Sequence, residues 1–226
     1  MDTATDDVSV AVVRDGEVVD ERLVPKPDRG RPRHAEALLV ELEGAVDAAG
    51  GWEAMDLLAV GIGPGSFTGL RVGLATARAI AQALAKPVAP VGTLAALAAG
   101  ISEAGAKGRS RLAVLDGRRG EAFAALFGPE GEEVWEPLVA KPEDLAERLR
   151  TRPDSALAAG SGALRFRGEL EAAGAEVLPD SSSAHRVWAR HVCRLAADGP
   201  PSPLEAIQPI YLRPPDAKVW LDRDSP

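Results

Sequence analysis

Short apolar runs alternate with segments of helical periodicity along most of the chain, a pattern typical of mixed α/β folds. Val8–Val13 and Val18–Val24 are rich in β-branched residues and flank a charged Asp-Gly turn at residues 14–17, which is a hairpin signal. After a basic, proline-rich segment at 25–33, apolar residues recur three and four positions apart, which predicts a helix over 34–49. These residues are Leu38, Leu39, Leu42, Val46 and Ala49.

Two strand–helix units follow the first helix. Met55–Ile62 is a compact apolar run that predicts a strand, and a glycine-rich loop separates it from a predicted helix over Leu70–Lys86. Pro87 ends that helix. Val88–Val91 predicts the next strand and Thr93–Glu103 the next helix.

The order of elements starts again near residue 109, which predicts a second, smaller α/β unit. Strands are expected over Leu112–Leu115, Ala122–Phe127, Glu132–Leu138 and Ala156–Ala159, and helices over Pro142–Arg150, Leu164–Ala173 and Ser183–Ala197. We therefore expect an N-terminal subdomain over residues 1–108, a C-terminal subdomain over 109–213 and an extended tail over 214–226.

The first residues do not fit the pattern of a core strand. Only Met1 precedes the polar run from Asp2 to Thr5, whereas a core strand needs several apolar residues. We expect either a misassigned start codon or a shortened first strand.

The composition excludes several classes of protein. The 226 residues include 26 Lys and Arg against 34 Asp and Glu, a formal net charge of −8. A stand-alone RNA-binding protein is therefore not expected, because its affinity comes largely from cations on phosphates. The sequence has no apolar run of roughly 18 residues and no secretory leader pattern. Cys193 is the only cysteine, which suits a reducing cytoplasm, and we expect a cytoplasmic protein without a membrane partner.

The most informative segment joins the strand ending at Ile62 to the following helix. It contains Gly63, Pro64, Gly65, Ser66, Phe67, Thr68, Gly69 and Arg71. Such a loop can aim backbone N–H groups and a helix N-terminus at an anion, or it can serve only tight turning and close helix packing. It matches neither the Walker A loop nor the dinucleotide-binding fingerprint.

Small residues form a ridge along the helix after that loop. Gly73, Ala77 and Ala81 lie four residues apart, so they share one face and let another backbone approach closely. The approach can occur inside the fold or between subunits. We hypothesise a protein interface made by this face together with Leu38 and Leu42 of the preceding helix.

Two other segments are weaker candidates for ligand binding. Asp2, Thr3 and Thr5 precede a hairpin in the way that actin-like ATPases place a phosphate loop, although this is also a common turn composition. Asp116 and Arg118 lie between two predicted strands, where they can meet a ligand or simply form a charged turn. The three histidines are scattered without metal-binding spacing, so no metal site is expected.

These segments together resemble the TsaB family, also called YeaZ. The match is carried by the opening Asp2–Thr5, by Gly63–Arg71 with the following Gly73, by the turn Asp116–Glu121 and by the ending Pro209–Arg213. Their order and spacing agree over nearly the whole chain. The resemblance implies a duplicated α/β fold of the actin-like, or sugar kinase and Hsp70-like, type (ASKHA) with a shortened second half.

The resemblance also implies a function. A protein of this family would be a non-catalytic scaffold or activator of the complex that adds threonylcarbamoyl to the adenosine beside the anticodon of tRNAs that read codons starting with A. It would bind the catalytic subunit TsaD as a heterodimer, with the ATPase TsaE joining them, and it could also form a homodimer. ATP and metal would sit on the partner subunits, and tRNA would be met through the complex.

The residues support this division of roles. TsaD-like proteins carry metal-binding histidines where this chain has Thr93 and Leu97, and neither side chain is a good ligand for iron or zinc. A protease is not expected, because no nucleophile is paired with a base. The alternative is an actin-like ATPase or small-molecule kinase that acts alone.

Overall fold

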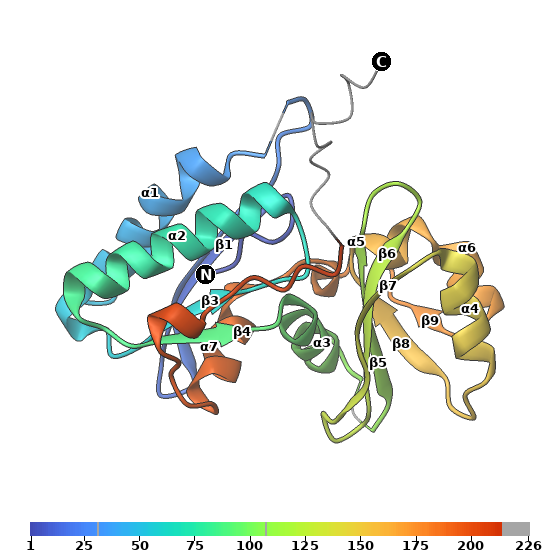
Figure 1. Ribbon diagram of the computed structural model, residues 1–226. Helices are drawn as coiled ribbons and strands as arrows, with labels where there is room; N and C mark the ends of the chain where they lie inside the picture. The colour runs from blue at the N-terminus through green and yellow to red at the C-terminus, as the bar shows by residue number, and fades with distance from the viewer. Residues whose placement is uncertain (31, 107, 214–226) are drawn as a thin grey trace, which may run out of the picture.

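The computed structural model describes residues 1–30, 32–106 and 108–213, which form two lobes (Figure 1). The N-terminal lobe begins with the hairpin β1 (Val8–Arg14) and β2 (Glu17–Val24). It continues with α1 (His34–Ala48), η1 (Trp52–Ala54), β3 (Leu58–Gly61), α2 (Phe67–Leu84), β4 (Val88–Val91) and α3 (Thr93–Glu103). The mixed α/β class and the order of the main elements agree with the sequence prediction.

The sheet of this lobe is assembled from two pairs of strands. β1 and β2 are antiparallel, whereas β3 and β4 are parallel. Met1 and Asp2 lie between the pairs: Asp2 exchanges two backbone hydrogen bonds with Ser9 of β1, and the Met1 carbonyl accepts from the N–H of Gly61 in β3. These two residues therefore connect the two pairs of strands.

The C-terminal lobe contains a single five-stranded sheet in the order β7-β6-β5-β8-β9. Its strands are β5 (Ser110–Asp116), β6 (Ala122–Phe127), β7 (Glu133–Ala140), β8 (Ala156–Ala159) and β9 (Glu176–Val177). Its helices are α4 (Pro142–Arg150), α5 (Ser161–Arg165) and α6 (Arg167–Ala172). Side chains of these helices and of the sheet form one apolar core, which includes Leu112, Leu126 and Leu145.

The end of the described chain returns to the N-terminal lobe. After η2 (Ser183–His185), helix α7 (Ala189–Ala197) packs against β1, and η3 (Leu204–Ala206) follows. Sequence analysis predicted one helix over 183–197, but residues 186–188 are not helical. Val187 is buried in the core between the lobes, and the N–H of Ala189 bonds to the Ser9 hydroxyl. The division at residue 108 stays a prediction, and the extended tail at 214–226 lies outside the described residues.

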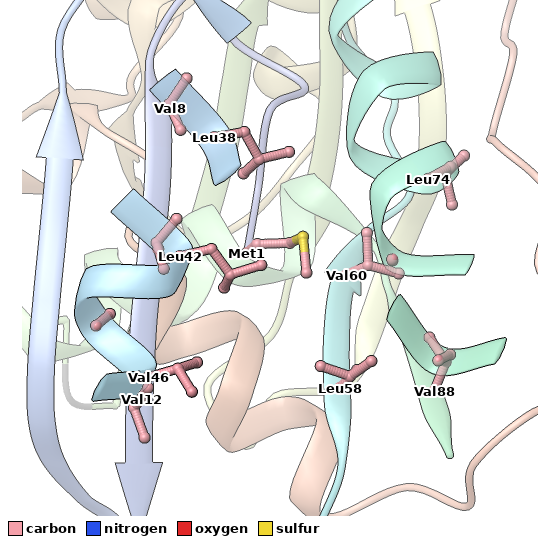
Figure 2. Close-up of a cluster of buried hydrophobic side chains, with 14 of the residues drawn as sticks. Met1, Val8, Val12, Leu38, Leu42, Val46, Leu58, Val60, Leu74 and Val88 are labelled. Carbon is pink, nitrogen blue, oxygen red and sulfur yellow. The ribbon is translucent and has the colours of Figure 1, made fainter. Parts of the chain in front are cut away.

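Four apolar cores are found among the described residues, and the smallest lies around Ile101, Leu157 and Ala184. One lies between α1, α2 and the N-terminal sheet, where Met1 sits between Leu42 and Val60 (Figure 2). A second fills the C-terminal lobe. The third joins the two lobes through α3 and α7, and it contains both Leu97 of α3 and Leu115 of β5. α3 therefore lies between the two sheets (Figure 1). No helix within the described residues is both long and apolar enough to cross a membrane.

Candidate functional site

The four segments that resemble family motifs meet at one cleft between the lobes. The cleft has a volume of about 930 Å³. The opening loop contributes Thr5, the signature loop Gly65, the central turn Asp116 and the C-terminal segment Tyr211 to its wall. These residues are far apart in the sequence, so only the packing of the two lobes brings them together.

The opening loop lies directly against α2 because glycines leave room for it. A Cβ atom added to Gly65 would be 2.2 Å from the carbonyl oxygen of Ala4, and one on Gly69 would be 1.9 Å from that of Thr3. A Cβ on Gly73 would be 2.4 Å from the Thr3 hydroxyl. The four-residue spacing of these glycines therefore serves close packing inside one chain, which is one of the two uses that the sequence left open.

Two of the predicted phosphate-loop residues are buried in that contact. The Asp2 carboxylate accepts hydrogen bonds from the N–H of Ala4 and from the hydroxyl of Thr93, each at 2.9 Å. Burial raises the pKa of Asp2 despite these bonds. The Thr3 hydroxyl donates to the carbonyl of Gly69 at 2.8 Å. Asp2 and Thr3 thus hold the loop in place, and of the predicted set Thr5 is the residue that reaches the cleft.

The signature loop is fixed at both ends by hydrogen bonds. Gly63 has a φ of +102°, which favours glycine, and its N–H donates to the Thr93 hydroxyl at 3.1 Å. The Ser66 hydroxyl accepts from the N–H of Gly69 and caps α2. α2 consequently begins at Phe67, three residues before the predicted start at Leu70.

Arginines of the C-terminal lobe bind the carboxylates of the cleft. Arg118 contacts both oxygens of Asp6 at 2.7 Å. Burial alone would raise the pKa of Asp6, but the hydrogen bonds and charges of Arg118 and Lys26 lower it. Asp7 pairs with Arg186 at 2.7 Å. Both predicted residues of the central turn are therefore at the cleft, and the Asp6–Arg118 pair crosses from one lobe to the other.

Asp116 is held within its own lobe. Both of its oxygens accept from Arg165 at 2.9 Å, and one also accepts from the N–H of Arg118. The three carboxylates of the cleft wall, from Asp6, Asp7 and Asp116, are thus each paired with an arginine. Among them, the pKa of Asp6 is lowered by its hydrogen bonds with Arg118 and Lys26, which makes this carboxylate a poor general base.

The C-terminal segment ties the signature loop to the central turn. The N–H of Ile210 donates to the carbonyl of Ile62 at 2.7 Å. The centroid of the Tyr211 ring lies 5.3 Å from that of the Phe67 ring. The Arg71 guanidinium lies over the same Phe67 ring, 4.0 Å from its centroid. Arg213 donates to the carbonyl of Gly117 at 2.6 Å. The segment therefore contacts both lobes.

The residues of the hypothesised partner interface lie inside the protein. Leu38, Leu42, Ala77 and Ala81 all belong to the core beneath α1 and α2, with at most 5 % of their surface exposed, and Gly73 packs on Thr3. This placement corrects the hypothesis, because buried side chains cannot meet a partner. The same two helices expose other residues, among them Leu39 and Val40 at 50 % and 64 %.

Several residues at the cleft were missed by sequence analysis. Asp6, Asp7 and Arg186 form ion pairs there, and Phe123 and His185 line its wall. The adjacent acids after Thr5 were a weak signal, but the arginine partner of each acid is more than 100 positions away. Among the described residues, no group of three or more His, Cys, Asp or Glu side chains is placed to hold a metal ion.

The sequence and structure are similar to those of known proteins. The family model described as "TsaD: tRNA N6-adenosine threonylcarbamoyltransferase" matches residues 25–169. The chain is 28 % identical to the tRNA threonylcarbamoyladenosine biosynthesis protein TsaB of Escherichia coli over 94 % of its own length and 93 % of the relative's. An uncharacterized protein of Mycobacterium bovis is 34 % identical over 96 % of this chain and 92 % of the relative.

A solved structure shows the same architecture. YeaZ from Pseudomonas aeruginosa superimposes with a TM-score of 0.76 at 27 % sequence identity, covering 93 % of this chain and 97 % of that protein. Together with the family match, this similarity confirms the predicted actin-like α/β fold.

Proposed function

The chain belongs to the TsaB (YeaZ) family, within the wider TsaD family, and from this premise we propose that it takes part in threonylcarbamoyladenosine biosynthesis in tRNA as a scaffold or activator without catalytic activity. Two relatives named for that pathway match 94 % and 72 % of this chain, which supports the pathway. The finer role rests on what the cleft residues do in this structure.

One observation carries the non-catalytic role: the positions that correspond to metal-binding histidines of TsaD-like proteins are used for folding here. Thr93 is fully buried, and its hydroxyl donates to Asp2 while it accepts from the N–H of Gly63. Leu97 is fully buried in the core between the lobes. Neither side chain can turn to a metal without breaking these contacts. The paired state of the cleft carboxylates supports the same role.

The outer face of α1 and α2 is the surface that we assign to a TsaD partner. Leu39 and Val40 are exposed on α1, and α2 exposes Ala75 and Ala79 one turn apart. The two helices lie side by side (Figure 1) and contact each other. An exposed apolar face with small residues lets a partner helix approach closely. A second copy of this chain would use the same face in a homodimer.

The remaining roles belong to the partners in this proposal. ATP and the metal ion sit on TsaD and TsaE, and tRNA is recognised mainly by the complex. The net charge of −8 supports this, because the chain by itself carries too little positive charge for strong phosphate binding.

The test is complex formation with the TsaD protein of the same organism, measured by size-exclusion chromatography with light scattering. We expect a one-to-one complex that Val40→Glu weakens at least tenfold, because a buried unpaired carboxylate is costly. Val134→Glu is the matched control, since Val134 is exposed at 39 % on β7 of the other lobe. No complex with the unmodified chain would overturn the scaffold role, and equal effects of both variants would overturn the assigned surface.

A parallel measurement addresses the alternative of an independent ATPase. We expect no steady, magnesium-dependent ATP hydrolysis by the isolated chain. Turnover that is lost in Arg118→Ala would instead assign a catalytic role to the cleft.

A further inference from the structure

Two aromatic residues are exposed side by side at the edge of the cleft. Phe67 is the first residue of α2 and Tyr211 belongs to the C-terminal segment, and they expose 38 % and 41 % of their surface. That segment runs from the N-terminal lobe toward the C-terminal lobe (Figure 1), so Tyr211 lies where the two lobes meet. Apolar surface that neighbouring rings leave in water is a common mark of a binding site.

Arg71 adds a positive charge to this pair of rings. Its guanidinium lies over the Phe67 ring, and the residue is exposed. Within the described residues no carboxylate pairs with Arg71, whereas Arg118 and Arg186 of the same cleft each bind an aspartate. Stacking on a ring leaves the donors of a guanidinium, which lie in its plane, open to an anion. We call Phe67, Arg71 and Tyr211 the aromatic rim.

The cleft has the opposite charge to the chain as a whole. Five arginines and three aspartates line it, whereas the full sequence has a formal net charge of −8. A concave site focuses the field of the charges on its walls. An anion is therefore attracted to the cleft although the protein is acidic.

The pairing of these side chains limits how much negative charge a ligand can bring. A nucleoside triphosphate carries several negative charges, and inside the cleft they would meet the carboxylates of Asp6, Asp7 and Asp116. Arg71 suits a ligand with a single negative charge next to a flat ring system. A nucleotide within an RNA strand has this composition, because each base is accompanied by one phosphodiester charge.

We propose that the aromatic rim binds one unpaired nucleotide of an RNA strand, with the base stacked on the Tyr211 ring and the phosphate on Arg71. Stacking of unpaired bases on aromatic side chains is a general way in which proteins bind single-stranded RNA. Rings at the edge of a cleft let the strand continue in both directions. The inference rests on the proposed function, in which tRNA is the RNA that the complex meets.

The rim adjoins the surface that we assign to a TsaD partner. Arg71 lies four positions before Ala75, so both residues are on the same side of α2. An RNA strand on the rim would thus lie next to the partner and contact both proteins. This position allows an acidic chain to contribute to RNA binding without strong affinity of its own.

The experiment measures the affinity of the full chain for fluorescein-labelled oligouridine by fluorescence anisotropy at low salt. The probe has about eight nucleotides, a length that single-strand sites cover. We expect Tyr211→Leu to weaken binding about fivefold or more, because the base loses its stacking partner, and Tyr211→Trp to retain it. Thermal unfolding of each variant checks that the fold is intact.

The charge of the rim is tested separately. We expect Arg71→Ala to weaken binding and to lower the salt dependence, the slope of log K against log salt concentration, by about 0.7. Arg150→Ala is the matched control, because Arg150 is exposed on α4 of the other lobe. It removes the same charge and should change neither quantity.

Four results would overturn the proposal. Equal effects of Arg71→Ala and Arg150→Ala would mean that charge alone attracts the RNA. Blunt duplex RNA bound as tightly as oligouridine would rule out stacking of an unpaired base, and UMP bound as tightly as the oligonucleotide would make a free nucleotide the ligand. Loss of TsaD binding in Tyr211→Leu with unchanged RNA affinity would assign the rim to the protein partner.

The scaffold role fails by a different result. If the unmodified chain formed no complex with TsaD, the scaffold role would be overturned, but RNA binding by the isolated chain and its loss in Tyr211→Leu would still support the aromatic rim. If the complex formed and neither it nor the isolated chain bound oligouridine, the rim would be overturned and the scaffold role would stand.

Discussion

The opening loop beneath the cleft, called its floor here although Asp2 and Thr3 do not line the cleft, and the mouth of the cleft are built from neighbouring residues but by different means. At the floor, Asp2 and Thr3 are buried, and backbone lies in direct contact with the glycines of α2. At the mouth, Asp6 meets Arg118, whose side chain is 61 % exposed. Buried polar groups are costly to leave without partners, whereas exposed ion pairs contribute little to stability. Neighbouring positions of one motif can therefore contribute very different amounts to the free energy of unfolding.

The largest effect is expected where backbone meets backbone at the floor. Gly69→Ala places a Cβ atom 1.9 Å from the carbonyl oxygen of Thr3, so the opening loop must move away from α2. We expect a loss of at least about 3 kcal/mol in the free energy of unfolding, measured by urea denaturation.

Gly168→Ala is the control for that change. Gly168 lies inside α6, and an added Cβ would meet nothing within 4 Å. We expect stability to be unchanged or up to about 1 kcal/mol higher, as for alanine in a helix. If Gly69→Ala behaved like this control, close packing would not be the reason for the glycine.

A smaller effect is expected where a side chain fixes the floor. Thr93→Val leaves the Asp2 carboxylate without one donor and the N–H of Gly63 without its acceptor. We expect a loss of about 2 kcal/mol in thermal or urea unfolding. Thr151→Val is the matched change at an exposed residue whose hydroxyl bonds to Arg148, and it should cost less than about 0.5 kcal/mol. Similar losses of unfolding free energy in both variants would contradict the conclusion that the buried Thr93 hydroxyl stabilises the fold more than an exposed one.

The smallest effect is expected at the mouth. Asp6→Asn removes the charge that pairs with Arg118 and Lys26, and we expect a loss of about 0.2–1 kcal/mol at neutral pH that shrinks in high salt. The pKa of Asp6 is lowered in the folded protein. The stabilisation is therefore present above the ordinary carboxyl pKa near 4 and is lost as the pH falls through the lowered value.

The measurement for Asp6 is the difference in unfolding free energy between the unmodified chain and Asp6→Asn as a function of pH. It should be positive at pH 7 and vanish under strongly acidic conditions. A difference that grew on acidification would have the wrong sign for this ion pair.

The elements with strong local signals could be predicted from the sequence. Leu38, Leu42 and Val46 recur at helical spacing, and α1 follows that pattern to within one residue of its expected end. The start of α2 was placed three residues late, because the cap is a single hydroxyl of Ser66 within a loop. The sequence did not show the break between η2 and α7 either. It depends on contacts with distant residues, because Val187 is buried in the core between the lobes and the N–H of Ala189 bonds to Ser9.

The candidate site was predictable as a set of segments but not as an arrangement. The sequence by itself determined the α/β order, the turn glycines and the motifs that identify the family, because these depend on local patterns. Only the tertiary structure decided that Gly73, Ala77 and Ala81 face the interior and that Asp6 meets Arg118. Spacing along a helix shows which residues share a face, but what covers that face depends on segments far away in the chain.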